Sequence, residues 1–167
     1  MINGARQVGS SLVEVLMALL LLSAGILGFV ILQYRALDAL TEAESRIQAM
    51  SIARDLAEKI RINRHQIQTY QKIIHQTDIQ TYPLNCFHHF CSAYQKARFD
   101  AVQLKLTAQR IGMTLNMITC PGINNGRYCV YVAWGDTAAT DADGVYNCTT
   151  SAYYRTESTC VVMEIYA

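Results

Sequence analysis

The stretch from Leu12 to Leu32 constrains the fold of this chain more than any other feature. It contains 21 residues, of which only Glu14 carries a charge. A helix of that length can cross the roughly 30 Å hydrocarbon core of a bilayer. A carboxylate at the entry to such a segment is costly to keep unpaired, so Glu14 is a candidate functional residue. We therefore predict an N-terminal helix whose first half lies in a membrane or in a larger assembly.

The helical pattern continues beyond the apolar stretch. No proline occurs before Pro83, so nothing forces a break. The helix predicted from about Ser10 to Ile62 would be roughly 80 Å long, which is more than a compact domain needs internally. Its second part has apolar residues spaced by three and four. This predicted stripe consists of Ala36, Leu40, Ala43, Ile47, Met50, Ala53 or Arg54, Ala57 and Ile60.

Two less regular segments and another helix follow. Residues 63–80 are polar with scattered apolar side chains, which predicts a second, shorter helix or a partly ordered connection. Residues 83–92 are a turn-rich loop. Helical spacing returns over residues 93–111, and Gly112 can end that helix. Its predicted stripe consists of Ala97, Ala101, Leu104, Ala108 and Ile111.

The apolar period changes to two in the last third of the chain, which indicates strands. Residues 121–126 are a hairpin signal, and residues 135–159 are a polar loop with at most a short fourth strand near Val145 and Tyr146. The expected fold class is α+β, a long N-terminal helix with a C-terminal antiparallel sheet of three or four strands. The three main strands are expected at residues 113–117, 129–134 and 160–166.

The charge balance gives no support for nucleic acid as the main partner. The chain has 14 basic and 13 acidic side chains, and without the first nine residues Arg6 is lost and the two are equal. One basic group with an aromatic residue could attract DNA, but Asp55 and Glu58 interrupt it, which favours an ordinary solvated helix face. That group consists of Arg54, Lys59, Arg61, Arg64, Tyr70 and Lys72.

All six cysteines follow the apolar stretch. An even number on one side of a membrane segment is typical of an oxidising compartment, in a bacterium the periplasm or the outside. Six cysteines allow 15 full pairings, so the connectivity needs a structural argument. The cysteines are Cys86, Cys91, Cys120, Cys129, Cys148 and Cys160.

Side-chain parity favours one pairing. Cys120 and Cys129 both lie off the apolar faces of their strands, so both point to the outer face of the hairpin. Cys86 and Cys91 are close enough in sequence to close their loop. Cys160 also faces outward, which leaves Cys148–Cys160 as the third pair after Cys86–Cys91 and Cys120–Cys129. The register that joins Cys120 to Cys129 also places Met117 opposite Val132 and Leu115 opposite Trp134.

Two clusters resemble metal sites. Cys86 and Cys91 enclose His88 and His89, and zinc uses these residue types at such spacings. A short disulfide is favoured in an oxidising compartment. A second cluster, in the polar loop, resembles part of a calcium loop but lacks the distant glutamate, which favours a solvated loop. We expect no metal, no other cofactor and no enzymatic activity. The acidic residues of that loop are Asp136, Asp141 and Asp143.

Glu14 has two interpretations. It could be an ordinary helix-end carboxylate, stabilised by the positive end of the helix dipole. It could also be a charge that needs a partner in the apolar phase. If cleavage freed an amine at Ser10, that amine would lie at a similar depth, and pairing between staggered chains would select their register during assembly.

Residues 9–19, Gly9 followed by SSLVEVLMAL, resemble the class III signal of type IV prepilins and pseudopilins. The resemblance implies a leader of residues 1–9, cleaved between Gly9 and Ser10 by prepilin peptidase, and N-methylation of Ser10. It implies that Glu14 forms a salt bridge with the amine of a neighbouring subunit. It also implies a ladle-shaped pilin fold, with residues 10–34 as the transmembrane or filament-core half of the helix and residues 35–167 as a periplasmic globular domain.

Within this family, residues 53–61 and residues 23–28 are similar to PilV-type minor pilins, as is the helix around residues 98–102. Two positions depart from the usual pattern, since Ser10 stands where phenylalanine is common and the helix lacks the proline of major pilins. The resemblance implies insertion in the bacterial inner membrane and later transfer to the pilus on the cell surface.

The function implied by this resemblance is that of a minor pilin that helps to initiate assembly of a type IV pilus in a priming or tip complex. Twitching motility, adhesion or DNA uptake would depend on it indirectly. The implied partners are other minor pilins, the major pilin, prepilin peptidase and the inner-membrane assembly platform. The alternatives are a pseudopilin of type II secretion, or a tip adhesin or DNA-binding minor pilin that uses the polar loop at residues 135–159 or the basic helix.

Overall fold

The computed structural model describes residues 11–76, 83–123 and 126–166. The chain divides into two compact units, Met1–Ala43 and Glu44–Ala167. The expected boundary at residue 34 follows hydropathy, whereas this division follows contacts within the chain.

Helix α1 runs without a break from Leu12 to Ile62, close to the predicted bounds. The predicted apolar stripe of its second part is only partly correct, since Ala53 and Ile60 are buried and other members are not. Ile47 is 68% exposed, and Leu56, which lies off that stripe, is fully buried. Apolar residues occur on more than one face here, and the covering elements decide which face is buried. The buried residues of α1 are Ala49, Ile52, Ala53, Leu56 and Ile60.

A short 3₁₀ helix, η1 (Arg64–Gln66), leads into α2 (Ile67–His75), as the sequence allows. Helix α3 (Ala93–Arg110) begins at a capping box, in which the Gln95 N–H donates to Ser92 Oγ and the Ser92 N–H donates to Gln95 Oε1. It ends where Gly112 adopts a φ of 72°, as predicted. Its predicted stripe is buried except for Ile111, which is 46% exposed because it follows the last helical turn.

Within the described residues, six strands form two sheets. The first has the order β1-β2-β6 and is antiparallel, and the second has the order β3-β4-β5 with β3 and β4 parallel. The short strand expected near Val145 and Tyr146 is found one residue later, because both residues lie in a turn and the strand begins at Asn147. The strands are β1 Met113–Thr119, β2 Tyr128–Trp134, β3 Ala138–Asp141, β4 Asn147–Thr150, β5 Tyr153–Tyr154 and β6 Cys160–Ile165.

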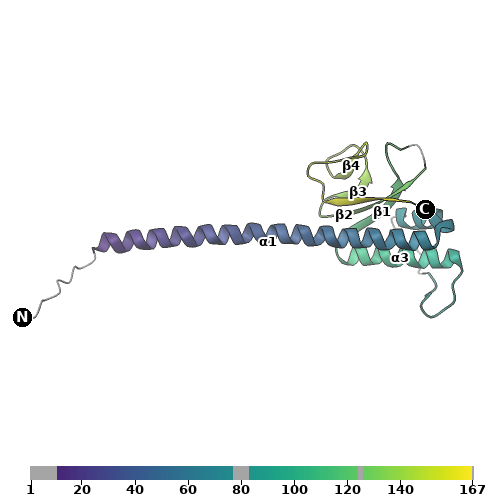
Figure 1. Cartoon of the computed structure of the whole chain (residues 1–167), viewed down its shortest axis with the longest axis horizontal. Helices are drawn as coiled ribbons and strands as arrows, with labels where there is room; N and C mark the ends of the chain where they lie inside the picture. Colours follow the sequence, from purple (N-terminus) through teal and green to yellow (C-terminus); the bar gives the residue numbers. More distant parts are fainter. Residues whose placement is uncertain (1–10, 77–82, 124–125, 167) are drawn as a thin grey trace, which may run out of the picture. The chain divides into compact units, whose positions relative to one another are not determined.

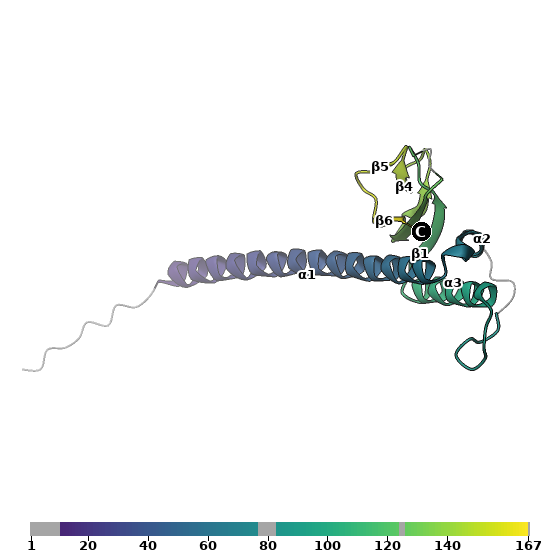
Figure 2. The same ribbon diagram turned by 45° about the vertical axis from the view of Figure 1, so that its right-hand side comes forward.

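The central strand of the first sheet, β2, is buried on both faces. One face packs with α1, α2 and α3 in the helix-side core, which contains Leu56, Met117 and Val132 (Figure 1). The opposite face, which includes Tyr131, packs with Ala139 and further residues of the second sheet in the sheet-side core (Figure 2). A long N-terminal helix followed by a C-terminal antiparallel sheet confirms the predicted α+β fold class. The second sheet is an addition that the sequence did not predict.

Candidate functional site

The first part of α1 is apolar and exposed. Among the residues that the structure describes, none before Ala49 is buried. This helix is also the single one in the described chain that is long and apolar enough to cross a membrane. Apolar surface left exposed over such a length requires another environment than water, either lipid or other chains.

Glu14 lies in the first turn of α1. Its N–H donates to the Ser11 carbonyl at 2.9 Å and lies 3.4 Å from Ser11 Oγ, so Ser11 caps the helix start. Within residues 11–76, 83–123 and 126–166, its carboxylate forms no ion pair. The predicted cleavage site Gly9–Ser10 and the predicted N-methylation at Ser10 lie outside the described residues. Pairing of Glu14 with another chain therefore stays a prediction.

Two glycines interrupt the apolar surface of α1 without interrupting the helix. A Cβ atom added at Gly25 or Gly28 would meet no other atom within 4 Å. Packing inside this chain therefore does not require glycine at either position. Small residues on an apolar helix permit the close approach of a second helix, so this segment offers a surface for helix–helix contact.

The six cysteines form three disulfides, and these are the three pairs expected from the sequence. Cys86–Cys91, Cys120–Cys129 and Cys148–Cys160 have Cα–Cα distances of 5.6, 4.9 and 5.9 Å. The first pair is partly exposed and closes a surface loop, whereas the four cysteines of the other two pairs are buried in the sheet-side core. The hairpin face that carries Cys120 and Cys129, predicted to point outward, is therefore covered by the second sheet.

The predicted hairpin register is wrong by two residues. Met117 lies opposite Val130 instead of Val132, and Leu115 lies opposite Val132 instead of Trp134. The disulfide is therefore diagonal, because Cys129 lies opposite Ile118 rather than opposite Cys120. An even shift leaves every side chain on its face, so the parity argument finds the correct pair from an incorrect register.

The structure gives the residues of the two possible metal sites other roles. The thiols of Cys86 and Cys91 are bonded to each other, and no group of three metal-ligating side chains occurs in the described parts of the chain. Asp141 Oδ1 accepts hydrogen bonds from Thr149 Oγ1 at 2.5 Å and from the Ala152 N–H at 3.3 Å. These bonds hold the turn at Ser151 and Ala152, both of which have positive φ.

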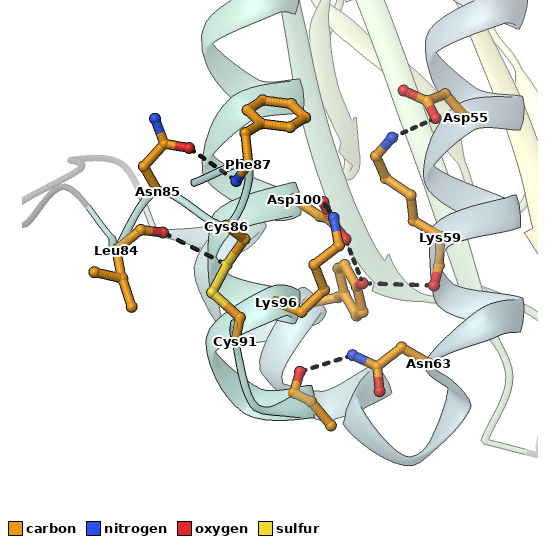
Figure 3. Close-up of polar contacts among 12 residues, drawn as sticks. Asp55, Lys59, Asn63, Leu84, Asn85, Cys86, Phe87, Cys91, Lys96 and Asp100 are labelled. Atoms are coloured by element: carbon orange, nitrogen blue, oxygen red, sulfur yellow. Dashed lines mark hydrogen bonds and ion pairs between the residues drawn. A yellow bond between two sulfur atoms is a disulfide. The ribbon is translucent and has the colours of Figure 1, made fainter. Parts of the chain in front are cut away.

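The basic helix does not form an aromatic binding platform. Lys59 pairs with Asp55 at 2.6 Å, and Tyr70 is fully buried. The Tyr70 hydroxyl lies 3.3 Å from Asp100 Oδ2 and 3.5 Å from the Lys59 carbonyl (Figure 3). Burial, and then the charge of Asp100, raise the pKa of the Tyr70 phenol well above its usual range. Tyr70 therefore joins α1, α2 and α3 from within and is inaccessible to a ligand.

Sequence reasoning missed two buried charged residues on α3. Asp100 pairs with Lys96 at 2.5 Å, and Lys105 Nζ donates to the Ile74 carbonyl at 3.1 Å and to the Gln76 carbonyl. Lys105 thereby satisfies carbonyls at the end of α2. The spacing of Lys96 and Asp100 by one helical turn was a usable signal. The two carbonyl partners of Lys105 are distant in sequence, so no local pattern indicated its role.

A groove of about 770 Å³ lies beside η1 and the ends of β2 and β6. Arg127 pairs there with Glu164 at 2.6 Å and stacks 5.0 Å from the centre of the Tyr166 ring. The hydrogen bond from Arg127 lowers the pKa of Glu164 and raises that of Arg127. Because this charge is compensated, the groove is not assigned to an anion. Its lining comprises Arg64, His65, Ile67, Gly126, Arg127, Tyr128, Ile165 and Tyr166.

A protein-family model matches part of the chain. Residues 31–102 match the model of a family described as Tt1218-like, type IV pilin Tt1218. The matched stretch runs from the apolar part of α1 to the middle of α3, and includes neither the signal-like residues 9–19 nor the sheets. No curated protein and no solved structure matches the chain. The match supports a type IV pilin, and with the apolar N-terminal helix it is consistent with membrane anchoring and pilus assembly.

Proposed function

We propose that this chain is a minor pilin of a type IV pilus, of the PilV type, that helps to initiate assembly in a priming or tip complex. The observation that carries the proposal is the match of residues 31–102 to a type IV pilin family, on a helix whose preceding apolar residues are all exposed. The similarity of residues 23–28 and 53–61 to PilV-type proteins supports the finer assignment.

The proposed location follows from the same features. The apolar half of α1 would hold the chain in the inner membrane, and the domain that carries the disulfides would lie in the periplasm before transfer to the filament. All six cysteines are paired and lie beyond the apolar stretch, as expected in an oxidising compartment. The proposed partners are other minor pilins, the major pilin, prepilin peptidase and the assembly platform. The proposal assigns no catalytic activity to the chain.

The first test removes the protein and counts surface pili. A deletion strain should show fewer pili and reduced twitching, and the full-length gene should restore both. Unchanged piliation would contradict the proposal. Proteins that co-purify with the full-length chain distinguish a minor pilin from a pseudopilin. Secretion components in place of pilus components would identify a pseudopilin of type II secretion.

The second test addresses Glu14. Glu14→Leu should lower incorporation into pili by at least about tenfold, because an unpaired neighbouring amine in an apolar core is costly. Membrane insertion and the mass of the cleaved N terminus, measured by mass spectrometry, should not change. Asp38→Leu, which removes an exposed carboxylate from the same helix, is the matched control. If Glu14→Leu instead abolished cleavage, the role assigned to Glu14 would be wrong.

A further inference from the structure

The loop closed by Cys86 and Cys91 displays two phenylalanines to solvent. Phe90 is fully exposed and Phe87 is 71% exposed, and Leu84 beside the loop is 45% exposed. Single exposed apolar residues are ordinary, but a contiguous group of large ones is typical of an interaction site. Neither phenylalanine belongs to the helix-side core or the sheet-side core.

The loop is held on a fixed support. The disulfide joins its ends, and the Phe87 N–H donates to Asn85 Oδ1 at 2.9 Å (Figure 3). Cys91 is followed directly by Ser92, the capped start of α3. The Phe87 ring also contacts the Phe99 ring edge to face, with centroids 5.1 Å apart. A partner would therefore meet a loop whose closed backbone and Phe87 ring are already held in place, which reduces the entropic cost of binding.

The segment that carries the loop has an excess of positive charge. Residues 83–111 contain one acidic side chain, Asp100, which is buried and paired with Lys96. Arg98 lies 5.9 Å from the centre of the partly exposed Tyr94 ring. The other arginine and histidine side chains at the surface of residues 83–111 therefore have no exposed carboxylate within this segment to neutralise them. They are His88, His89, Arg98 and Arg110.

We propose that the loop Cys86–Cys91, together with the first turns of α3, docks on the surface of an anionic phospholipid bilayer. Protruding aromatic side chains can enter the boundary between headgroups and acyl chains, and flanking cations pair with lipid phosphates. The inference is independent of the proposed pilin function.

The observations favour a bilayer over single-stranded nucleic acid. Nucleic acid bases stack on aromatic residues along a basic groove. Here Phe90 projects from a tight loop, and the cavity next to the loop has a volume of about 190 Å³ and is lined on one side by Phe99 and Val102. A convex aromatic feature suits a deformable surface better than a strand of stacked bases.

The test uses the full chain in nanodiscs of phosphatidylcholine, so that the apolar helix is already in lipid. Large sucrose-loaded vesicles are added, and the fraction of discs that sediments with them is measured. Vesicles that contain phosphatidylglycerol should retain about fivefold more chain than phosphatidylcholine vesicles at low salt, and raising the salt to about 0.5 M should remove most of this difference because exposed charges are screened.

Two variants assign the binding to the loop. Phe87→Ser with Phe90→Ser should abolish the retention, and Phe90→Ser alone should lower it severalfold without affecting the Phe87–Phe99 contact. The matched control is Tyr146→Ser with Tyr153→Ser, which removes two exposed aromatic rings, one from the turn before β4 and one from β5. Retention should not change in the control. Thermal unfolding of each variant shows whether the fold is kept.

Several results would overturn the proposal. These are retention no greater than that of empty discs, equal retention on both kinds of vesicle, and retention that persists in a folded loop variant. Binding of a single-stranded oligonucleotide that depends on Phe87 and Phe90, with no binding to anionic vesicles, would also overturn it and would assign the loop to nucleic acid.

Discussion

The two faces of the first sheet are buried in different ways. The helix-side core is large and mostly aliphatic, and it contains no cysteine. The sheet-side core is small, and four of its members are the cysteines of two disulfides. Apolar burial of the first kind stabilises a fold by itself, at about 25 cal/mol per Å². Where little apolar area is available, cross-links that constrain the unfolded chain take over part of that role.

Leu56→Ala tests the helix-side core and should have the largest effect. Leu56 is fully buried, so its truncation should lower the free energy of unfolding by about 3–5 kcal/mol through lost burial and a cavity. Chemical denaturation of the full chain in detergent measures the change. Ile47→Ala is the matched control on the same helix, and it should stay within about 0.5 kcal/mol because Ile47 is exposed. Equal losses would contradict the observed buried face.

Removal of the disulfide Cys148–Cys160 tests the sheet-side core. Changing both residues to alanine should cost about 3 kcal/mol by the loop-closure model, since the bond closes a segment of sequence separation 12. Hydrogen exchange should accelerate in β3, β4 and β5 more than in α3 or β1. The control is the same change at Cys86 and Cys91, which should leave exchange in the second sheet unchanged. Uniform acceleration across all elements would show that the two cores unfold as one.

Tyr131→Phe should have the smallest effect and concerns one hydrogen bond of the sheet-side core. The Tyr131 hydroxyl lies 3.1 Å from Thr149 Oγ1, and burial raises the pKa of this phenol. Loss of the bond should cost about 1 kcal/mol, measured by denaturation. Tyr128→Phe, on the opposite face of β2, is the control and should be nearly neutral. A neutral Tyr131→Phe would mean that this bond does not contribute to the sheet-side core.

The difference between the two cores also explains what could be predicted. The strands of the helix-side core show clean alternation, as in Met113, Leu115 and Met117, and that period identifies them. The second sheet has no such signal. Its strands are short. Some of its buried residues are polar, such as Thr149, whose hydroxyl forms a hydrogen bond, and these do not add to an apolar pattern. Cys148 is its clearest marker, but a cysteine indicates a cross-link and not a strand.

The candidate site divides in the same way. The apolar stretch and Glu14 are visible in the sequence, because a long run with one charge has few physical solutions. In the loop at Phe87 and Phe90, the histidines and cysteines suggest a site, whereas nothing in the sequence shows that the phenylalanines are exposed. Phenylalanine is usually buried, so only the folded chain shows that these two are not.

The sequence by itself determined the extent of α1 and α3 and the three main strands, because each depends on local period and on the absence of helix breakers. It also determined the cysteine pairs, from the parity of Cys120 and Cys129, the short separation of Cys86 and Cys91, and elimination for the third pair. The tertiary structure alone decided which face of α1 is buried, the hairpin register and the presence of a second sheet. A helix with apolar residues on several faces does not specify its partner, and a shift of two residues changes no side-chain face. Such choices depend on contacts between segments distant in the chain, and those contacts are absent from any local pattern.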